Sequence, residues 1–355
     1  MSPSLSAVVC SYNGAARLGR TLDALAAQTV HADLEIIVVD DASVDGTGDV
    51  ARGHGITVIR HETNRGVSAA RDTGLRAAKG RVVAFLDDDC EPGPRWAELL
   101  LGGYAEEGVA GVGGPVVPVT GDGFVSRFLE RNNRHEPLEL ELTVSAALPY
   151  RLWLYLRRQW AAGRTAGRVA GGRRDVYAFS GGNMSFERER LLAAGGFDPR
   201  FRYAAEEEDL SRRLRRDDRL GRLVFVPEAS VAHRYTPTTR GMLRRSLSYG
   251  RGAAMQYLKW PAVRPTVFPW PVLVAGLALA AVRWPAVAVA PVLLPLLLYP
   301  VGLRNAARGR IEALADPYLL MAQEACENVG FLHGLWAFRR MFAGDGTGRG
   351  GRQGT

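Results

Sequence analysis

Short apolar runs alternate with helical patterns over the first third of the chain. The strand-like runs, rich in β-branched residues, cover residues 6–11, 34–39, 56–61 and 82–86. Between them, apolar residues recur at helical spacing, and glycines mark the ends of the helical segments. This alternation predicts a parallel sheet with helices on both faces, and it places ligands at the carboxyl ends of the strands.

The pattern becomes less regular in the middle of the chain, over residues 115–179. Within it, the segment 151–160 mixes Trp, Leu and Arg. That segment is either an amphipathic helix on a membrane surface or an ordinary helix whose Trp and Leu face a core. Ordered patterns return between Phe179 and His233, and they include a strand at Leu223–Val226.

The region 266–303 changes character, because two uncharged stretches are separated only by Arg283 and Trp284. Each stretch is short for a hydrocarbon core of ~30 Å, and prolines interrupt both. Aromatic residues near the ends and basic residues on both flanks are typical of membrane segments. The pattern predicts a hairpin that crosses or re-enters a membrane, with both flanks cytoplasmic. The alternative is a buried helix pair, although such a pair normally shows a polar face.

These patterns divide the chain into five successive parts. We expect an α/β domain at 1–235, a linker or interface helix at 236–265, the apolar hairpin at 266–303, amphipathic helices at 304–342 and a disordered Gly-rich tail at 343–355.

Composition excludes some functions. Hydrophobic residues make up 47% of the 355, as in ordinary globular proteins, and the net charge is +8. Nearly all basic residues are Arg, which indicates a compositional bias, and no basic cluster carries the interleaved aromatics of an RNA-binding surface, so we expect no nucleic-acid partner. The cysteines, Cys10, Cys90 and Cys326, form no CxxC pair, so the sequence supports neither a zinc site nor a disulfide framework.

Acidic residues follow two of the predicted strands. Asp40 and Asp41 end the second strand, and Asp87, Asp88 and Asp89 end the fourth. Because side chains alternate along extended backbone, Asp87 and Asp89 can point the same way. Hard carboxylate oxygens favour Mg²⁺ or Mn²⁺, which commonly bridge to a diphosphate. Neither GxxxxGK[ST] nor GxGxxG after the first strand is present, so no P-loop or dinucleotide fingerprint explains the cluster.

Six segments resemble, in order and spacing, the motifs of family 2 inverting glycosyltransferases. The resemblance covers about Ser6 to His233 and continues more loosely into the membrane-associated tail that many members carry. It implies an α/β fold of the GT-A type and transfer of a sugar from a nucleotide-diphospho-sugar, with inversion and with Mg²⁺ or Mn²⁺. The six segments are VVCSYNG, IIVVDDASVDGT, NRGVSAARDTG, FLDDD, SGGNMSF and EEEDLSRRL.

The resemblance also implies roles for individual residues. Asp89 would coordinate the metal that holds the diphosphate, with Asp87 and His233 as further metal ligands. Asp41 is favoured over Asp40 for the base or ribose, and many relatives have Asn where this chain has Asp72. The positions implied to bind the nucleotide are Ser11, Tyr12, Asp40, Asp41, Asn64, Arg71, Asp87 and Asp88. The positions implied to lie near the donor sugar and acceptor are Gly181, Gly182 and Asn183.

The catalytic base is expected in the acidic run that begins at Glu206. Inverting transfer needs a carboxylate that takes the proton of the acceptor hydroxyl. Where relatives often have Gly-Glu-Asp-x-Asp-Leu, this chain has Ala205, three Glu, Asp209 and Leu. The family's Asp falls on Glu207, so the resemblance favours Glu207 as the base and Asp209 as the second candidate. Such a run also suits a helix N-terminus, where carboxylates complement the positive dipole end.

The resemblance and the apolar hairpin together predict the partners. The donor would be a UDP-, GDP- or dTDP-sugar, and the acceptor a lipid-linked saccharide, a glycolipid or a surface polysaccharide at the cell membrane, with the catalytic domain cytoplasmic. A polymer-extruding synthase is not expected, because one hairpin cannot line a channel and QxxRW is absent. The alternatives are a non-catalytic scaffold that binds nucleotide-sugar and, less consistent with CSYNGAARLG, a nucleotidyltransferase.

Overall fold

The computed structural model describes residues 3–30, 33–119, 121–132, 148–161, 172–216, 221–235, 238–261 and 268–343. The described residues fall into two compact units. The first holds those of Met1–Thr120 and Arg168–Tyr235, and the second holds those of Gly121–Asn132, Glu141–Gly167 and Thr236–Thr355. Residues 344–355 of the predicted tail lie outside the described residues. Residues 262–267, at the start of the apolar region, do so as well.

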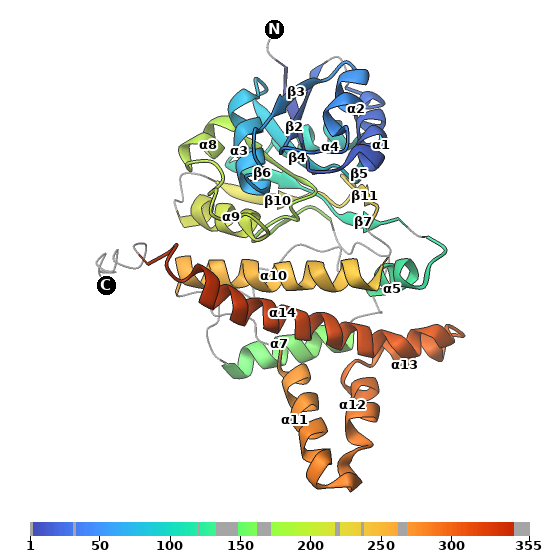
Figure 1. Ribbon diagram of the computed structural model, residues 1–355. Coiled ribbons are helices and arrows are strands. Elements are labelled where there is room, and N and C mark those ends of the chain that lie inside the picture. The colour runs from blue at the N-terminus through green and yellow to red at the C-terminus, as the bar shows by residue number, and fades with distance from the viewer. Residues whose placement is uncertain are drawn as a thin grey trace. The chain divides into compact units, whose positions relative to one another are not determined.

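Two sheets form the first unit (Figure 1). Its strands are β1 (Leu5–Ser11), β2 (Leu34–Asp40), β3 (Thr57–Arg60), β4 (Val82–Asp87), β5 (Cys90–Pro92), β6 (Val109–Gly113), β7 (Val116–Pro118), β8 (Arg174–Asp175), β9 (Met184–Glu187), β10 (Arg222–Phe225) and β11 (Val231–His233). The large sheet has the order β3-β2-β1-β4-β9-β6-β10-β8, and the small one β5-β11-β7. In the large sheet β3, β2, β1 and β4, the four strands predicted over the first third of the chain, pair in parallel, and so do β6 and β10. Strand β9 runs antiparallel to both β4 and β6, so the sheet is mixed.

Helices bury both faces of the large sheet. In β1 the side chains of Leu5, Ala7 and Val9 enter one apolar cluster and Val8 enters the other, as the two-residue period of a strand requires. Each buried aliphatic side chain of this kind contributes about 1.5–3 kcal/mol. The first cluster includes residues of α1 (Ala15–Ala26), α2 (Thr47–Gly53) and α4 (Trp96–Gly103). The second includes residues of α3 (Val67–Ala77), α8 (Arg188–Ala193) and α9 (Glu206–Arg216).

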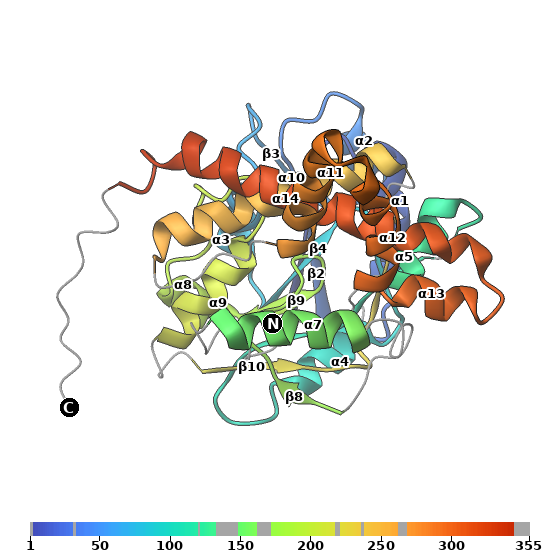
Figure 2. The same ribbon diagram turned by 90° about the horizontal axis from the view of Figure 1, so that it is seen from below.

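The second unit is helical. Its elements are α5 (Phe124–Asn132), α7 (Leu148–Ala161), α10 (Thr239–Lys259), α11 (Pro269–Arg283), η2 (Pro285–Val287), α12 (Ala290–Leu298), α13 (Val301–Ala306), η3 (Ile311–Ala315) and α14 (Asp316–Phe338). The long helices α10 and α14 lie side by side in both views (Figure 1, Figure 2). Glycines allow this close approach, because a β-carbon at Gly250 would overlap the carbonyl of Glu327 and one at Gly330 would overlap that of Leu247.

Helices α5 and α7 belong to the second unit, although the sequence predicts one domain over residues 1–235. Ion pairs explain the difference for α5: Arg127 binds Glu312, and Arg131 binds Asp316. In α7, Tyr155 donates a 2.7 Å hydrogen bond to Glu324 and packs on Phe268 and Trp270. Trp153 of the same helix is exposed, so α7 presents aromatic side chains both to the unit's interior and to its surface.

The apolar region forms a pair of helices, α11 and α12, that point away from α14 (Figure 1). At its base the backbone N–H of Phe268 donates to the side chain of Asn328, and Asn328 donates back to the Phe268 carbonyl, both at 2.9 Å. Helix α11 has 15 residues and α12 has nine, with Pro285 beginning the turn between them. Among the residues described here, no helix combines the length and apolar character that crossing a membrane requires.

Candidate active site

Neighbouring strands of the first unit end at the same edge of the large sheet. In the parallel register Ser11 of β1 lies beside Asp40 of β2, and β1 also pairs with β4, whose last residue is Asp87. Beyond Asp87 the chain turns through Asp88 and Asp89 into β5, which belongs to the small sheet. The predicted acidic residues therefore meet at the carboxyl ends of the strands, where this architecture places ligands.

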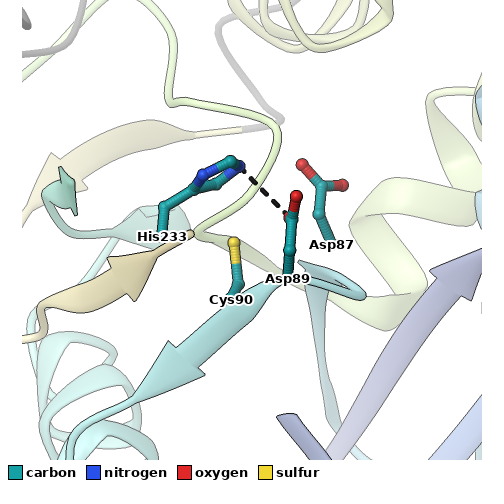
Figure 3. A group of neighbouring side chains, drawn as sticks. All are labelled: Asp87, Asp89, Cys90 and His233. Carbon is teal, nitrogen blue, oxygen red and sulfur yellow. Dashed lines mark ion pairs between the residues drawn. The ribbon is translucent and has the colours of Figure 1, made fainter. Parts of the chain in front are cut away.

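Four side chains converge at this edge (Figure 3). Asp87, Asp89, Cys90 and His233 each offer one donor atom, and these atoms all lie within 4.8 Å of one another. The Nε2 atom of His233 is 3.2 Å from Oδ1 of Asp89. Burial, followed by the negative charges of Asp87 and Asp88, raises the pKa of Asp89 to about 7. A nearby cation would favour the ionised form of Asp89, and the cluster offers oxygen and imidazole donors, so it fits a divalent cation.

Asp88 faces away from this cluster. Its carboxylate accepts a hydrogen bond from Ser11 Oγ and two from Arg17 of α1, at 3.1 and 3.0 Å. Burial raises its pKa in spite of these contacts. Both side chains predicted to bind the nucleotide here, Ser11 and Asp88, are thus engaged with each other, and their contact joins the end of β1 to the turn after β4.

Arg71, predicted to contact the nucleotide, lies inside the first unit with its side chain only 2% exposed. It forms an ion pair with Glu206 and donates 2.9 Å hydrogen bonds to Asp87 and to the Gly181 carbonyl. Two carboxylates in contact raise its pKa, although burial alone would lower it. In this structure Arg71 therefore joins the sheet edge at Asp87 to the N-terminus of α9.

Replacing Arg71 with Met is expected to lower the free energy of unfolding by about 3 kcal/mol, because it leaves Glu206 as a buried charge without its partner. Urea denaturation measures the loss. The double variant Arg71→Met/Glu206→Gln should recover part of it, since both buried charges are then absent. A single variant as stable as the parent would contradict the prediction.

Asp40 and Asp41, at the end of β2, accept hydrogen bonds from backbone groups of the neighbouring loops. Asp41 accepts hydrogen bonds from the backbone N–H groups of Arg65 and Gly66, at 2.9 and 2.8 Å, and lies 2.6 Å from His61 Nδ1. Asp40 forms an ion pair with Arg60 and accepts from the N–H of residue 43. The remaining positions predicted for the nucleotide, Tyr12 and Asn64, are exposed beside these loops.

The SGGNMSF segment places Gly181 and Gly182 at the site, and the side-chain amide of the next residue, Asn183, holds buried backbone in place. A β-carbon at Gly182 would lie 3.1 Å from Sγ of Cys90 and 3.2 Å from an oxygen of Asp87, so glycine keeps this edge open. Asn183, predicted to lie near the sugar, has a different role. It is fully buried, accepts from Trp96 Nε1 and donates to the carbonyls of residues 115 and 229.

The acidic run begins α9, with four carboxylates in its first turn, where the helix dipole favours negative charge. Their environments differ. Glu206 binds Arg71, and the fully buried Asp209 pairs with Arg213 of the same helix at 2.9 Å. Glu207 is partly exposed, and burial together with the charges of Glu206 and Glu208 raises its pKa well above the usual range. Of the two predicted bases, Glu207 has the environment of a proton acceptor.

Helix α9 is preceded by Ala205, whose φ of 71° lies in the left-handed region. A β-carbon strains this conformation by about 1–2 kcal/mol, whereas glycine adopts it freely. Ala205→Gly should therefore raise the free energy of unfolding by about 1 kcal/mol and raise the melting temperature in a calorimetric scan. Unchanged or lower stability would show that the helix start tolerates alanine without strain.

Sequence reasoning missed Cys90, Arg17 and Glu206 as parts of this site. Cys90 has no second cysteine near it in the sequence, although its position directly after Asp-x-Asp is a usable signal. Arg17 pairs with Asp88 and Glu206 pairs with Arg71 through tertiary packing, so the sequence did not reveal these partners even though Glu206 begins the acidic run.

Comparison with known proteins agrees with this geometry. Residues 6–178 match the family model described as glycosyl transferase family 2. Over 232 residues, the chain is 32% identical to the pre-mycofactocin glycosyltransferase of Mycobacterium tuberculosis, covering 64% of this chain and 43% of that protein. Over 120 residues, it is 34% identical to the glycosyltransferase AglE of Haloferax volcanii, covering 32% of this chain and 40% of that protein. The chain thus spans less than half the length of these relatives.

A solved structure shares the fold. The mannosyltransferase PcManGT from Pyrobaculum calidifontis, determined in complex with GDP-Man and Mn²⁺, superposes with a TM-score of 0.53 at 19% sequence identity, over 95% of this chain and 88% of that one. The mixed sheet, the acidic strand ends and the matched segment lead to one conclusion. Residues 6–178 are similar to glycosyl transferase family 2, and the chain has the α/β fold of GT-A glycosyltransferases.

Proposed function

We propose that this protein is an inverting glycosyltransferase that moves a sugar from a nucleotide-diphospho-sugar to an acceptor held at a membrane. One observation carries the proposal. The Asp87–Asp89 edge and the acidic N-terminus of α9 are joined by a single buried guanidinium, that of Arg71, so a phosphate-binding centre and a candidate base belong to one site.

Asp87, Asp89 and His233 would hold Mg²⁺ or Mn²⁺. When bound, such an ion neutralises the charge that develops on the departing diphosphate. PcManGT, which shares the fold, was solved with Mn²⁺ and GDP-Man, and this supports a divalent ion and a nucleotide-diphospho-sugar as donor. Gly182 leaves room beside Asp87 for the phosphates, and Tyr12, 50% exposed, lies where a base or ribose could rest.

Glu207 would take the proton of the acceptor hydroxyl. The hydroxyl oxygen forms a bond to the anomeric carbon from the face opposite the diphosphate, the bond between that carbon and the diphosphate oxygen breaks, and its electron pair leaves with the nucleotide diphosphate. This geometry inverts the anomeric centre. The raised pKa makes Glu207 a stronger base than an ordinary carboxylate.

A donor screen tests the proposal. The full-length protein is incubated with UDP-, GDP- and dTDP-sugars, Mn²⁺ or Mg²⁺ and membrane extract, and nucleotide release and the mass of extracted lipids are measured. We expect one donor class to give metal-dependent release together with a lipid heavier by one sugar. Binding of a donor without release under every condition would instead support a non-catalytic scaffold.

The apolar hairpin supports attachment to the cytoplasmic face of the cell membrane. Its exposed large apolar side chains are Val272, Leu273, Leu279, Val282, Trp284, Val289, Val292, Leu293 and Leu297. Water disfavours such a surface, whereas lipid accepts it. Arg304, Arg308 and Arg310 follow the hairpin in the sequence and would meet anionic headgroups.

Leu279→Asp/Leu297→Asp is expected to weaken binding to anionic vesicles by at least about 10-fold, since a carboxylate is disfavoured in the apolar layer. Both side chains are well exposed, 75% and 67%, so folding should persist. Vesicle flotation measures the effect. Val44→Asp, at an exposed apolar position of the first unit, is the matched control and should bind like the parent. Equal flotation of the parent and both variants would show that the hairpin does not attach the protein to the membrane.

A further inference from the structure

The group formed by Asp87, Asp89, Cys90 and His233 contains a sulfur donor that the proposed reaction does not use. Cys90 is fully buried, and its Sγ belongs to the same 4.8 Å group as the donor atoms of Asp87, Asp89 and His233 (Figure 3). Gly182 faces both Cys90 and Asp87, since a β-carbon there would lie 3.1 Å from the sulfur and 3.2 Å from the carboxylate. The thiol thus points toward the carboxylates rather than away from them.

Strand pairing holds the sulfur in this place. Cys90 begins β5 and His233 ends β11, and the antiparallel register sets these two residues directly opposite each other. Directly opposed residues of an antiparallel pair project their side chains from the same face of the sheet. Asp89, next to Cys90 in the turn, lies 3.2 Å from His233. The thiol, the imidazole and the carboxylate therefore come together through backbone geometry and not through flexible side chains.

The donor set is mixed in chemical character. Two carboxylates alone suit the hard ions Mg²⁺ and Mn²⁺, which have little affinity for thiolate. One thiolate, one imidazole and two carboxylates instead form the four-donor set that Zn²⁺ and Co²⁺ bind in tetrahedral geometry, with bonds of roughly 2.0–2.3 Å. Donor atoms already within 4.8 Å of one another need only small movements to reach those distances.

We propose that Cys90 makes this cluster a binding site for thiophilic divalent ions, Zn²⁺ or Co²⁺, which bind more tightly than Mn²⁺ or Mg²⁺ with the Cys90 thiolate as a ligand. On binding, the thiol proton passes to solvent, the sulfur donates an electron pair to the ion, and no oxidation state changes. The inference rests on the metal site of the proposed function. A tetrahedral ion with four protein ligands has no open position for a diphosphate, so Zn²⁺ would inhibit donor binding.

Co²⁺ titration of the full-length protein tests the inference by absorption, without any need for sugar transfer. We expect a sulfur-to-Co²⁺ charge-transfer band that saturates at one ion per chain and disappears when Zn²⁺ is added. The double variant Cys10→Ser/Cys326→Ser keeps Cys90 as its only thiol and should retain the band. Cys90→Ser should lose the band and bind Zn²⁺ about 10–100-fold more weakly, while its Mn²⁺ affinity stays nearly unchanged.

Two results would overturn the inference. One is a Co²⁺ complex of the parent protein without a sulfur band, and the other is absence of the band from Cys10→Ser/Cys326→Ser. Neither depends on whether Cys90→Ser folds, which circular dichroism checks separately. A sulfur band together with failure of every nucleotide-sugar to react would retain the metal assignment and reject only the proposed transferase activity.

Discussion

Asp89→Asn is expected to lower metal-dependent sugar transfer by about 10³-fold, because it removes a ligand charge where the negative charge of the departing diphosphate must be neutralised. Asp89 lies among the donors of the cluster, 3.2 Å from His233. Asparagine keeps the shape and one oxygen but carries no charge. Two measurements belong together: nucleotide release at saturating donor, and the dissociation constant of Mn²⁺ from calorimetric titration. Both should change.

The matched control is Asp88→Asn, in the same turn. Its carboxylate faces Ser11 and Arg17 rather than the cluster, so Mn²⁺ affinity should stay close to that of the parent, although stability falls. If Asp89→Asn transferred sugar at the parent rate, or if Asp88→Asn lost Mn²⁺ as severely, the cluster would not be the metal centre of the reaction.

Glu207→Gln is expected to lower kcat by about 10²–10⁴-fold with little change in the KM for the donor, because glutamine cannot take a proton. The change is nearly isosteric, and the acidic N-terminus of α9 keeps its other three carboxylates. Steady-state kinetics with a defined acceptor separate the two constants. A rise in KM at constant kcat would mean that Glu207 binds substrate rather than serving as base.

The pH profile gives an independent readout of the same residue. Glu207 acts as a base only when ionised, and its pKa is raised, first by burial and then by Glu206 and Glu208. The rate of the parent should therefore rise with pH through a value above the ordinary Glu range and fall as pH drops below it. Glu207→Gln should lack this acidic limb. Retention of the limb would assign the titration to another group.

Asp209→Asn separates base chemistry from structure. Asp209 is fully buried and pairs with Arg213 at 2.9 Å, so its neutralisation should destabilise the fold by about 3 kcal/mol while kcat of the folded fraction changes far less than in Glu207→Gln. The opposite ranking of the two variants would make Asp209, the second candidate, the base.

Much of the catalytic fold could be predicted because its signals are local. Continuous apolar runs predicted the parallel strands β1, β2, β3 and β4 nearly to the residue. The signal is strongest in β1 and β4, since strands buried on both faces leave few polar positions. The acidic first turn of α9 marked a helix start. The apolar hairpin was harder. Its two short uncharged stretches left crossing and re-entry of a membrane both open, and in the structure they form α11 with 15 residues and α12 with nine.

The inner contacts of the site could not be predicted, because they depend on which distant strands pair. The register of β5 with β11 sets Cys90 opposite His233, and tertiary packing pairs the buried Arg71 with Glu206 of α9. Asn183 looked like a ligand residue in its glycine-rich segment, yet its amide satisfies Trp96 and two backbone carbonyls. The sequence showed which residue types could bind a metal or accept a proton, but it did not show which partner each residue would contact.

One guanidinium serving both Asp87 and Glu206 has a bearing on how this enzyme can be altered. A substitution near either carboxylate affects both, because movement of Arg71 toward one of them weakens its contact with the other. Efforts to broaden the acceptor range by mutating the start of α9 should therefore shift donor preference as well. Libraries that vary residues on both sides of Arg71 together will outperform those that vary either side separately.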